Sequence, residues 1–174
     1  MKHGKEVVKL KQIVIKFSVA KGAFSFFMFW MFRHKYTHAA IGLHRDGDAF
    51  YSFSLKGFST EKKRTSTPKT WRENYAYYYI DVRESDYDKL VALVEQFQQN
   101  QEQYRYSTFE VFCALLKIPY QVKSGYYCSY FVADLLTSSG VYTLKKSPSL
   151  YLPHDLYQEI KNHAHIEYTC GSAG

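Results

Sequence analysis

The N-terminal half of the chain carries the hydrophobic patterns of a small β-sheet. Residues 11–18 are rich in β-branched side chains and bounded by polar ones, which predicts a strand. Two similar runs, 37–43 and 49–55, flank a polar turn with its tip at Asp46-Gly47, and this arrangement predicts a β-hairpin. His38 therefore opens the first strand of that hairpin.

Another strand is predicted over residues 74–83, and a helix follows it. Ser85 is the expected N-cap of this helix, because apolar residues then recur on one face until the pattern ends near Gln99. The segment 57–72 lies between the hairpin and this strand. It contains a run of charged residues and Pro68, so we expect an exposed connection there.

The C-terminal half is predicted to be mainly helical. Apolar residues over 108–116 predict a short buried helix that ends before Pro119. Cys113 lies inside it, where a small hydrophobic core residue is expected. A second helix is predicted from Cys128 to about Ser139, with Phe, Val and Leu residues on its buried face.

A strongly aromatic run occupies residues 23–32, directly before the basic sequence Arg33-His34-Lys35. The run is too short to cross a bilayer, because a spanning helix needs about 20 residues. A buried helix or hydrophobic platform is the favoured interpretation, and a patch in contact with lipid or an acyl chain is the alternative. The apolar residues near the N-terminus are interrupted by lysines, which does not match a signal peptide.

Length and composition fit one domain over residues 1–174, with a peripheral tail at about 163–174. The net charge of +7 comes from 23 basic and 16 acidic residues, but the basic residues are scattered, so nucleic-acid binding is not expected. The chain has 17 Tyr, 13 Phe and 2 Trp. Tyrosine combines apolar area with a polar tip, which suits the wall of a cleft as well as a core.

The three cysteines, Cys113, Cys128 and Cys170, form no closely spaced pair. With no export signal recognised, we expect reduced thiols and a cytoplasmic location. The cysteines and the seven histidines do not combine into the spacing of a zinc site. No metal or cofactor is therefore expected.

Cys128 and His38 are the residues whose positions point to chemistry. Cys128 opens an apolar helix, where unpaired backbone N–H groups and the helix dipole favour a thiolate and can also hold an oxyanion. A catalytic thiol needs a base, usually histidine. His38 is better placed for this than His34, which follows the aromatic run, or His44, about 20 Å further along the strand at ~3.3 Å per residue.

The motifs around these two residues resemble a known family. Thr37-His38-Ala39-Ala40-Ile41-Gly42-Leu43 and Tyr126-Tyr127-Cys128-Ser129-Tyr130-Phe131-Val132-Ala133 are similar to motifs of the circularly permuted branch of NlpC-type papain-like cysteine hydrolases. YiiX-like proteins belong to this branch, and the lecithin-retinol acyltransferases are a related group. In the branch the histidine strand precedes the cysteine helix, as it does here, and the resemblance spans roughly residues 11–155.

The resemblance implies an α+β fold, with a small antiparallel sheet packed against helices. It implies Cys128 as nucleophile, His38 as base, and a third polar residue on the next strand that orients the imidazole. Relatives place a strong acceptor there, whereas the best correspondence in this chain is Ser52, with Ser54 on the same face of the strand. A serine hydroxyl stabilises an imidazolium less than a carboxylate does.

The leading hypothesis is therefore a cysteine-dependent hydrolase of the amidase or peptidase type, or an acyltransferase. Its substrate would be a small-molecule, peptide or lipid-like amide or ester. The alternative is a non-enzymatic module that binds a lipid or peptide in the same aromatic-lined cleft. It is suggested by the weak third residue, Ser52, and by the aromatic run at 23–32.

Overall fold

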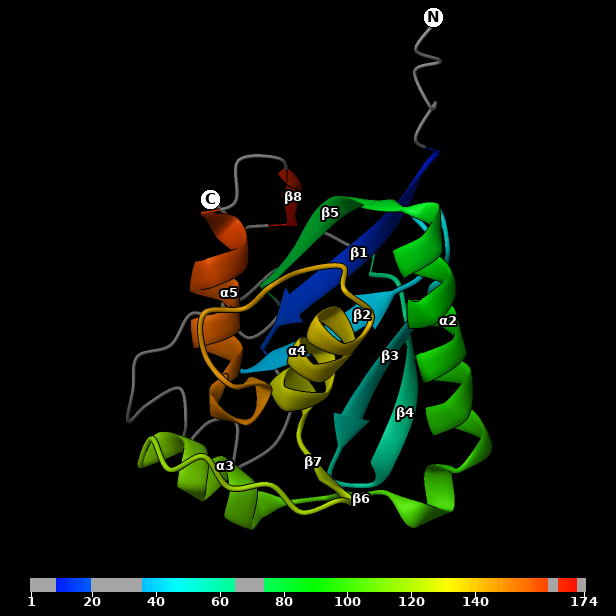
Figure 1. The fold of residues 1–174 in the computed structure, drawn as a ribbon. Helices are drawn as coiled ribbons and strands as arrows, with labels where there is room; N and C mark the ends of the chain where they lie inside the picture. Colours follow the sequence, from blue (N-terminus) through cyan, green and yellow to red (C-terminus); the bar gives the residue numbers. More distant parts are fainter. Residues whose placement is uncertain (1–8, 20–35, 65–73, 163–165, 172–174) are drawn as a thin grey trace, which may run out of the picture.

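The central strand of the fold is the β-branched segment that begins the described chain. The computed structural model describes residues 9–19, 36–64, 74–162 and 166–171. β1 (Leu10–Ser18) pairs with β2 (His38–Gly42) on one side and with β5 (Tyr75–Arg83) on the other. Both pairings are antiparallel, so β1 lies in the interior of the sheet (Figure 1).

The sheet has six strands in the order β4-β3-β2-β1-β5-β8, all in antiparallel pairs. β3 (Ala49–Ser54) follows β2 as the predicted hairpin, with Ile41 opposite Tyr51. β4 (Gly57–Lys62) and β8 (Ile166–Gly171) form the two edges. The predicted α+β class and the antiparallel sheet are thus confirmed.

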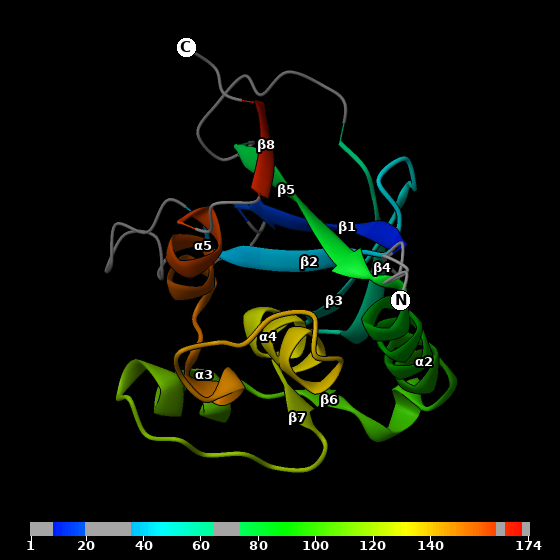
Figure 2. The same ribbon diagram turned by 45° about the horizontal axis from the view of Figure 1, so that its top comes forward.

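Helices cover one face of this sheet. α2 (Glu84–Gln99), α4 (Cys128–Ser138) and α5 (Pro153–Lys161) lie on the same side, with α4 between the other two (Figures 1 and 2). α3 (Thr108–Leu115) lies at one end of the fold. The remaining elements are two short 3-10 turns, η2 (Gln101–Gln103) and η3 (Pro148–Leu150), and a small parallel pair of strands, β6 (Arg105–Tyr106) and β7 (Gly125–Tyr126).

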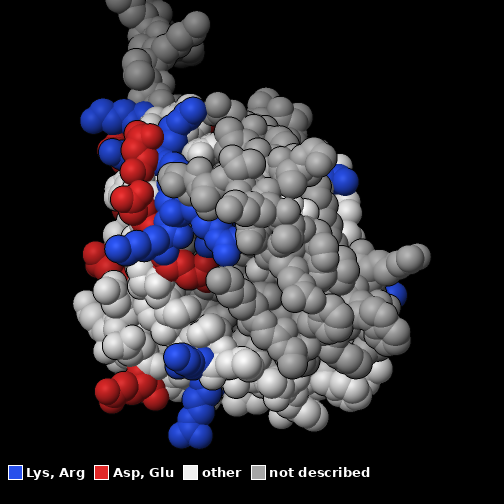
Figure 3. All heavy atoms as spheres, turned by 180° about the vertical axis from the view of Figure 1, so that it is seen from behind, with Lys and Arg blue, Asp and Glu red and all other residues white. Residues whose placement is uncertain are grey.

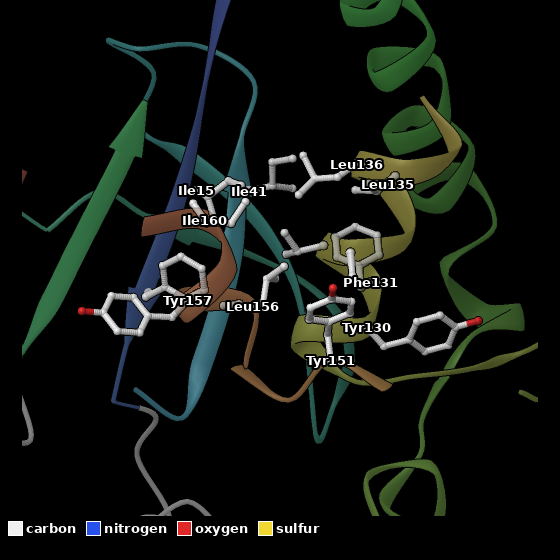
Figure 4. Packing of buried hydrophobic residues seen from close by; sticks show 14 of the residues in the cluster. Ile15, Ile41, Tyr130, Phe131, Leu135, Leu136, Tyr151, Leu156, Tyr157 and Ile160 are labelled. Atoms are coloured by element: carbon white, nitrogen blue, oxygen red, sulfur yellow. The ribbon is translucent and has the colours of Figure 1, made fainter. Parts of the chain in front are cut away.

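The main core lies between the sheet and α4 and α5. Figure 4 shows its side chains, which come from β1 and β2 (Ile15, Ile41), from α4 (Phe131, Leu135, Leu136) and from α5 (Leu156, Tyr157, Ile160). Each such side chain contributes about 1.5–3 kcal/mol when it is fully buried. The apolar face predicted for α4 is therefore confirmed, and its burial fixes the helix against β2 and β3.

A second apolar cluster forms because the central strands are buried on both faces. Side chains alternate along a strand, so Ile13 and Ile15 belong to the main core and Val14 to the other cluster. The members of this second cluster are Val14, Ala40, Phe50, Tyr75, Tyr77 and Tyr79. Much of the tyrosine content of the chain is thus core rather than cleft wall.

Several predicted boundaries differ from the structure. β4 lies within the segment 57–72 that was predicted to be an exposed connection, and residues 65–73 lie outside the described residues. α2 begins at Glu84 without a side-chain cap, so Ser85 is not its N-cap. The predicted peripheral tail contains β8, which pairs with β5 along the sheet edge. Backbone pairing stabilises this segment, which its polar sequence does not indicate.

The aromatic run at 23–32 lies outside the described residues, so neither interpretation of it is tested. In the part of the chain that is described, no helix is long and apolar enough to cross a membrane.

Candidate functional site

Cys128 is the first residue of α4, as predicted. The preceding residue, Tyr127, has extended backbone angles (φ −128°, ψ 167°) and provides no side-chain cap. Its hydroxyl donates instead to the Ser149 carbonyl (2.6 Å), which anchors the entry to the helix. The first hydrogen bond of the helix runs from the Phe131 N–H to the Tyr127 carbonyl (2.9 Å). The N–H groups of the first turn therefore have no acceptor within the helix, and they lie directly beside Cys128.

His38 is the first residue of β2, and its side chain lies between Cys128 and Glu61. Nε2 of the imidazole hydrogen-bonds to Oε1 of Glu61. Burial lowers the pKa of His38, but hydrogen bonds and charge interactions with Cys128 and Glu61 outweigh it and raise this pKa from 6.5 to about 10. The contacts with Cys128 and Glu61 thus favour the protonated, charged form of the His38 imidazole.

Glu61 is the carboxylate of this site, and sequence reasoning missed it. It lies near the end of β4, opposite Phe50 of β3, with a quarter of its side chain exposed. Burial raises its pKa, but hydrogen bonds and charge interactions with His38 and Lys16 lower it from 4.5 to about 2. Glu61 is therefore held as a carboxylate next to the imidazole.

Lys16, on the central strand β1, is the third charged residue of this site, beside Glu61 and His38. Its ammonium Nζ lies 2.6 Å from Oε2 of Glu61, and only 5% of its side chain is exposed. Nζ also lies 5.7 Å from the centre of the Phe50 ring, within the range of a cation–π contact. A buried lysine needs such a partner because an unpaired buried charge is costly. One oxygen of Glu61 thus contacts Lys16 and the other contacts His38.

The hydroxyl of Ser52, predicted to orient the imidazole, donates its hydrogen bond to the backbone. Ser52 is fully buried in β3, and its hydroxyl donates to the Ala39 carbonyl of β2 (2.6 Å). A hydroxyl has one proton to donate, so this bond ties the two hairpin strands together. The orienting contact that we predicted for Ser52 is made by Glu61 instead.

Of the competing histidines, His44 is described by the structure, and its imidazole contacts a residue other than those of the site. His44 lies in the turn after β2, where Nδ1 is 3.1 Å from the Tyr87 hydroxyl. His34 lies outside the described residues. His44 therefore has a structural partner on α2, Tyr87.

Cys128 affects the pKa of two neighbouring tyrosines. Burial and the charge of Cys128 both raise the pKa of Tyr106, on β6, and of Tyr127. Tyr127 thus flanks the candidate site. The neighbouring Tyr126 stacks on Tyr130 with ring centres 4.6 Å apart, and both Tyr126 and Tyr127 belong to the main core.

Within the described residues, no group of three or more His, Cys, Asp or Glu side chains is placed to hold a metal ion. Comparison of the chain with models of protein families, with curated proteins and with solved structures finds no match in any of the three. What the site can do chemically follows from its own geometry.

Proposed function

We propose that the protein is a cysteine-dependent hydrolase or acyltransferase that acts on an ester or amide carbonyl. One observation carries the proposal: the His38 side chain interacts with Cys128 on one side and with the Glu61 carboxylate on the other. A nucleophile, a base and a group that orients the base are the three parts of an activated-nucleophile site.

In the acylation step, the Cys128 thiolate attacks the carbonyl carbon and forms a C–S bond. The carbonyl π electrons move to oxygen, and N–H groups at the start of α4 stabilise this oxyanion. The oxyanion then collapses, the bond to the leaving nitrogen or oxygen breaks, and the His38 imidazolium gives its proton to the leaving group. A thioester on Cys128 and a neutral imidazole remain.

In the second step, an acceptor attacks the thioester while His38 takes its proton. Water as acceptor gives a carboxylic acid, and an alcohol or amine gives a new ester or amide. The C–S bond breaks and the thiolate–imidazolium pair is restored. Glu61 acts here as a positioning residue, because its hydrogen bond fixes the imidazole and its charge stabilises the imidazolium.

The fold we propose for this activity is the permuted NlpC-type papain-like fold. Three features support it: the antiparallel sheet, the histidine on strand β2, and the cysteine at the start of the later helix α4. The third residue departs from the expected pattern, because Glu61 lies on β4 and not on the second strand of the hairpin. A carboxylate is nevertheless the strong acceptor that such a site uses.

The binding-module alternative loses one of its two supports. It was suggested partly by the weak acceptor expected at Ser52, and the imidazole has a carboxylate partner instead. We therefore favour the enzyme, and we place a peptide, lipid-like or other small amide or ester in the role of substrate.

The test is to trap the acyl-enzyme. Wild-type protein is mixed with a p-nitrophenyl ester, quenched in acid, digested and analysed by mass spectrometry, with release of p-nitrophenol followed in parallel. We expect the acyl group on the peptide that contains Cys128, and loss of p-nitrophenol release in Cys128→Ala. Cys113→Ala is the matched control and should keep both signals. Acylation of Cys113 to the same extent, or full activity of Cys128→Ala, would refute the proposal.

A further inference from the structure

Helix α3 does not have the burial that its sequence predicts. Its buried residues include Glu110, Val111, Cys113 and Ala114, whereas Phe109 and Phe112 are more than half exposed. The aromatic stripe of the helix, continued by Leu116, therefore faces away from the core. The prediction of a buried helix over 108–116 is correct for one face only.

The exposed apolar side chains continue into the chain that follows α3. Eight large hydrophobic side chains are exposed among the described residues, and six of them lie between positions 109 and 122. We call these six the α3 surface: Phe109, Phe112, Leu116, Ile118, Tyr120 and Val122, each between 42% and 59% exposed. A concentration of this kind marks an interaction site more often than chance exposure does.

Hydrogen bonds and ring packing hold the α3 surface in one shape. The Val122 N–H donates to Oε1 of the buried Glu110 (2.6 Å), which fastens the returning chain to the helix. The rings of Phe109 and Tyr120 meet edge to face, with centres 5.3 Å apart. Gly125 allows the close approach of Glu110, because a Cβ at this position would lie 2.5 Å from Oε2.

The exposed charged residues within the segment that carries the α3 surface have one sign. From Tyr104 to Ser129 the exposed charged residues are Arg105, Lys117 and Lys123, and the one acidic residue, Glu110, is buried. The face behind the sheet differs, because basic and acidic side chains lie next to one another there (Figure 3). A rigid apolar surface whose own segment adds three exposed basic residues matches an anionic lipid bilayer, where apolar side chains enter the interface and lysines meet the headgroups.

We propose that the α3 surface docks the protein onto anionic lipid membranes. Figure 1 shows α3 at the end of the fold opposite to the start of β1. The chain returns from this surface through β7 directly to Cys128, so docking would bring the bilayer to the neighbourhood of the candidate site. The docking itself does not depend on the proposed chemistry.

The test is co-sedimentation of the full-length protein with vesicles of phosphatidylcholine alone and of phosphatidylcholine mixed with phosphatidylserine. We expect binding to the mixed vesicles, and weaker binding to the neutral ones. Replacing both Phe112 and Leu116 with Ser should weaken binding by about tenfold or more. Leu10→Ser, at a residue 60% exposed at the start of β1, is the matched control and should bind like wild type.

The charge arm of the experiment uses Lys117→Gln with Lys123→Gln. We expect a loss of roughly twenty- to thirtyfold on mixed vesicles, because each lysine near an anionic surface contributes about fivefold. Lys9→Gln, at an exposed lysine directly before β1, is the control for a lysine away from the surface. Cys128→Ala should bind like wild type, so failure of the proposed activity and failure of docking can be told apart.

Three results would overturn the proposal. The first is no sedimentation of wild type with mixed vesicles. The second is an equal loss in Leu10→Ser and in the Phe112/Leu116 variant. The third is a dimer in light scattering that the Phe112/Leu116 variant abolishes while vesicles capture neither protein, which would assign the surface to contact between copies of the chain. Thermal unfolding of each variant, expected to match wild type because these side chains are exposed, guards against misfolding.

Discussion

Cys113 and Cys128 have the same exposed fraction, 6%, and both are free thiols in helices. Their surroundings differ. Cys113 lies inside α3, and among the described residues its thiol makes no hydrogen bond or ion pair. Cys128 opens α4 and interacts with the His38 side chain. Since accessibility is matched, a difference in reactivity between them reports on the helix start and the histidine.

This comparison shows that burial and helix membership do not make a cysteine a nucleophile. The required features are unpaired N–H groups and a charged partner, and both depend on where the helix begins. The chain reaches Cys128 through the anchored Tyr127, which places the thiol at the first turn of α4, facing β2.

The largest effect is expected for His38→Ala. Without the imidazole, the thiolate loses its counter-ion and the leaving group loses its proton donor, so p-nitrophenyl ester turnover should fall by about 10²–10⁴-fold. His44→Ala is the control, because His44 contacts Tyr87 and not the site. Full turnover in His38→Ala would remove the basis for distinguishing the two cysteines.

A smaller effect is expected for Glu61→Gln. A hydrogen bond to a charged group contributes about 1.5–3 kcal/mol, so turnover should fall by roughly ten- to a hundredfold. The pKa of His38, followed by NMR of the imidazole, should fall as well, since Glu61 helps to raise it. Glu95→Gln on the exposed side of α2 should change neither. An unchanged His38 pKa would show that Glu61 does not act on the imidazole.

For Ser52→Ala we expect a change in stability rather than in chemistry. The substitution leaves the buried Ala39 carbonyl without its hydroxyl donor, which should lower the free energy of unfolding by roughly 1–3 kcal/mol in urea titrations. Ester turnover per folded molecule should stay at the wild-type level. A large loss of turnover in a stable Ser52→Ala protein would return Ser52 to the catalytic site and displace Glu61 from our account.

The pH dependence of stability should reflect the His38–Glu61 pair. The pKa of His38 is raised to about 10, so its contribution is complete below pH 6.5 and is lost as the pH rises toward 10. The pKa of Glu61 is lowered to about 2, so its contribution is complete above pH 4.5 and is lost as the pH falls toward 2. The stability difference between wild type and Glu61→Gln should therefore be largest between these limits. A difference that is constant over pH would contradict the pairing.

The sequence predicted those parts of the site that depend on local patterns. Strand β2 with His38 at its start and helix α4 with Cys128 at its start follow from β-branched runs and from the apolar face of the helix. Glu61 could not be found in this way, because it begins a run of four charged residues that normally indicates a solvated segment. Its burial depends on partners 45 and 23 residues earlier in the chain, Lys16 and His38.

Helix α3 shows a second limit of pattern reasoning. Its aromatic stripe indicates a buried face, yet the structure buries the face that carries Glu110. The reason is a specific contact, the bond from the Val122 N–H to the Glu110 carboxylate, which hydrophobicity does not encode. Two local signals could have predicted β4. One is the turn at Lys56-Gly57, and the other is the occurrence of Phe58 and Thr60, residue types common in strands, at alternate positions.

The most direct test of the central claim measures the alkylation rates of both cysteines in one reaction. Wild-type protein and His38→Ala are treated with iodoacetamide, and the modified Cys128 and Cys113 peptides are quantified over time by mass spectrometry. We predict that Cys128 reacts about tenfold faster than Cys113 or more, and that His38→Ala removes most of this difference. Equal rates at the two thiols in the folded wild-type protein would contradict the account.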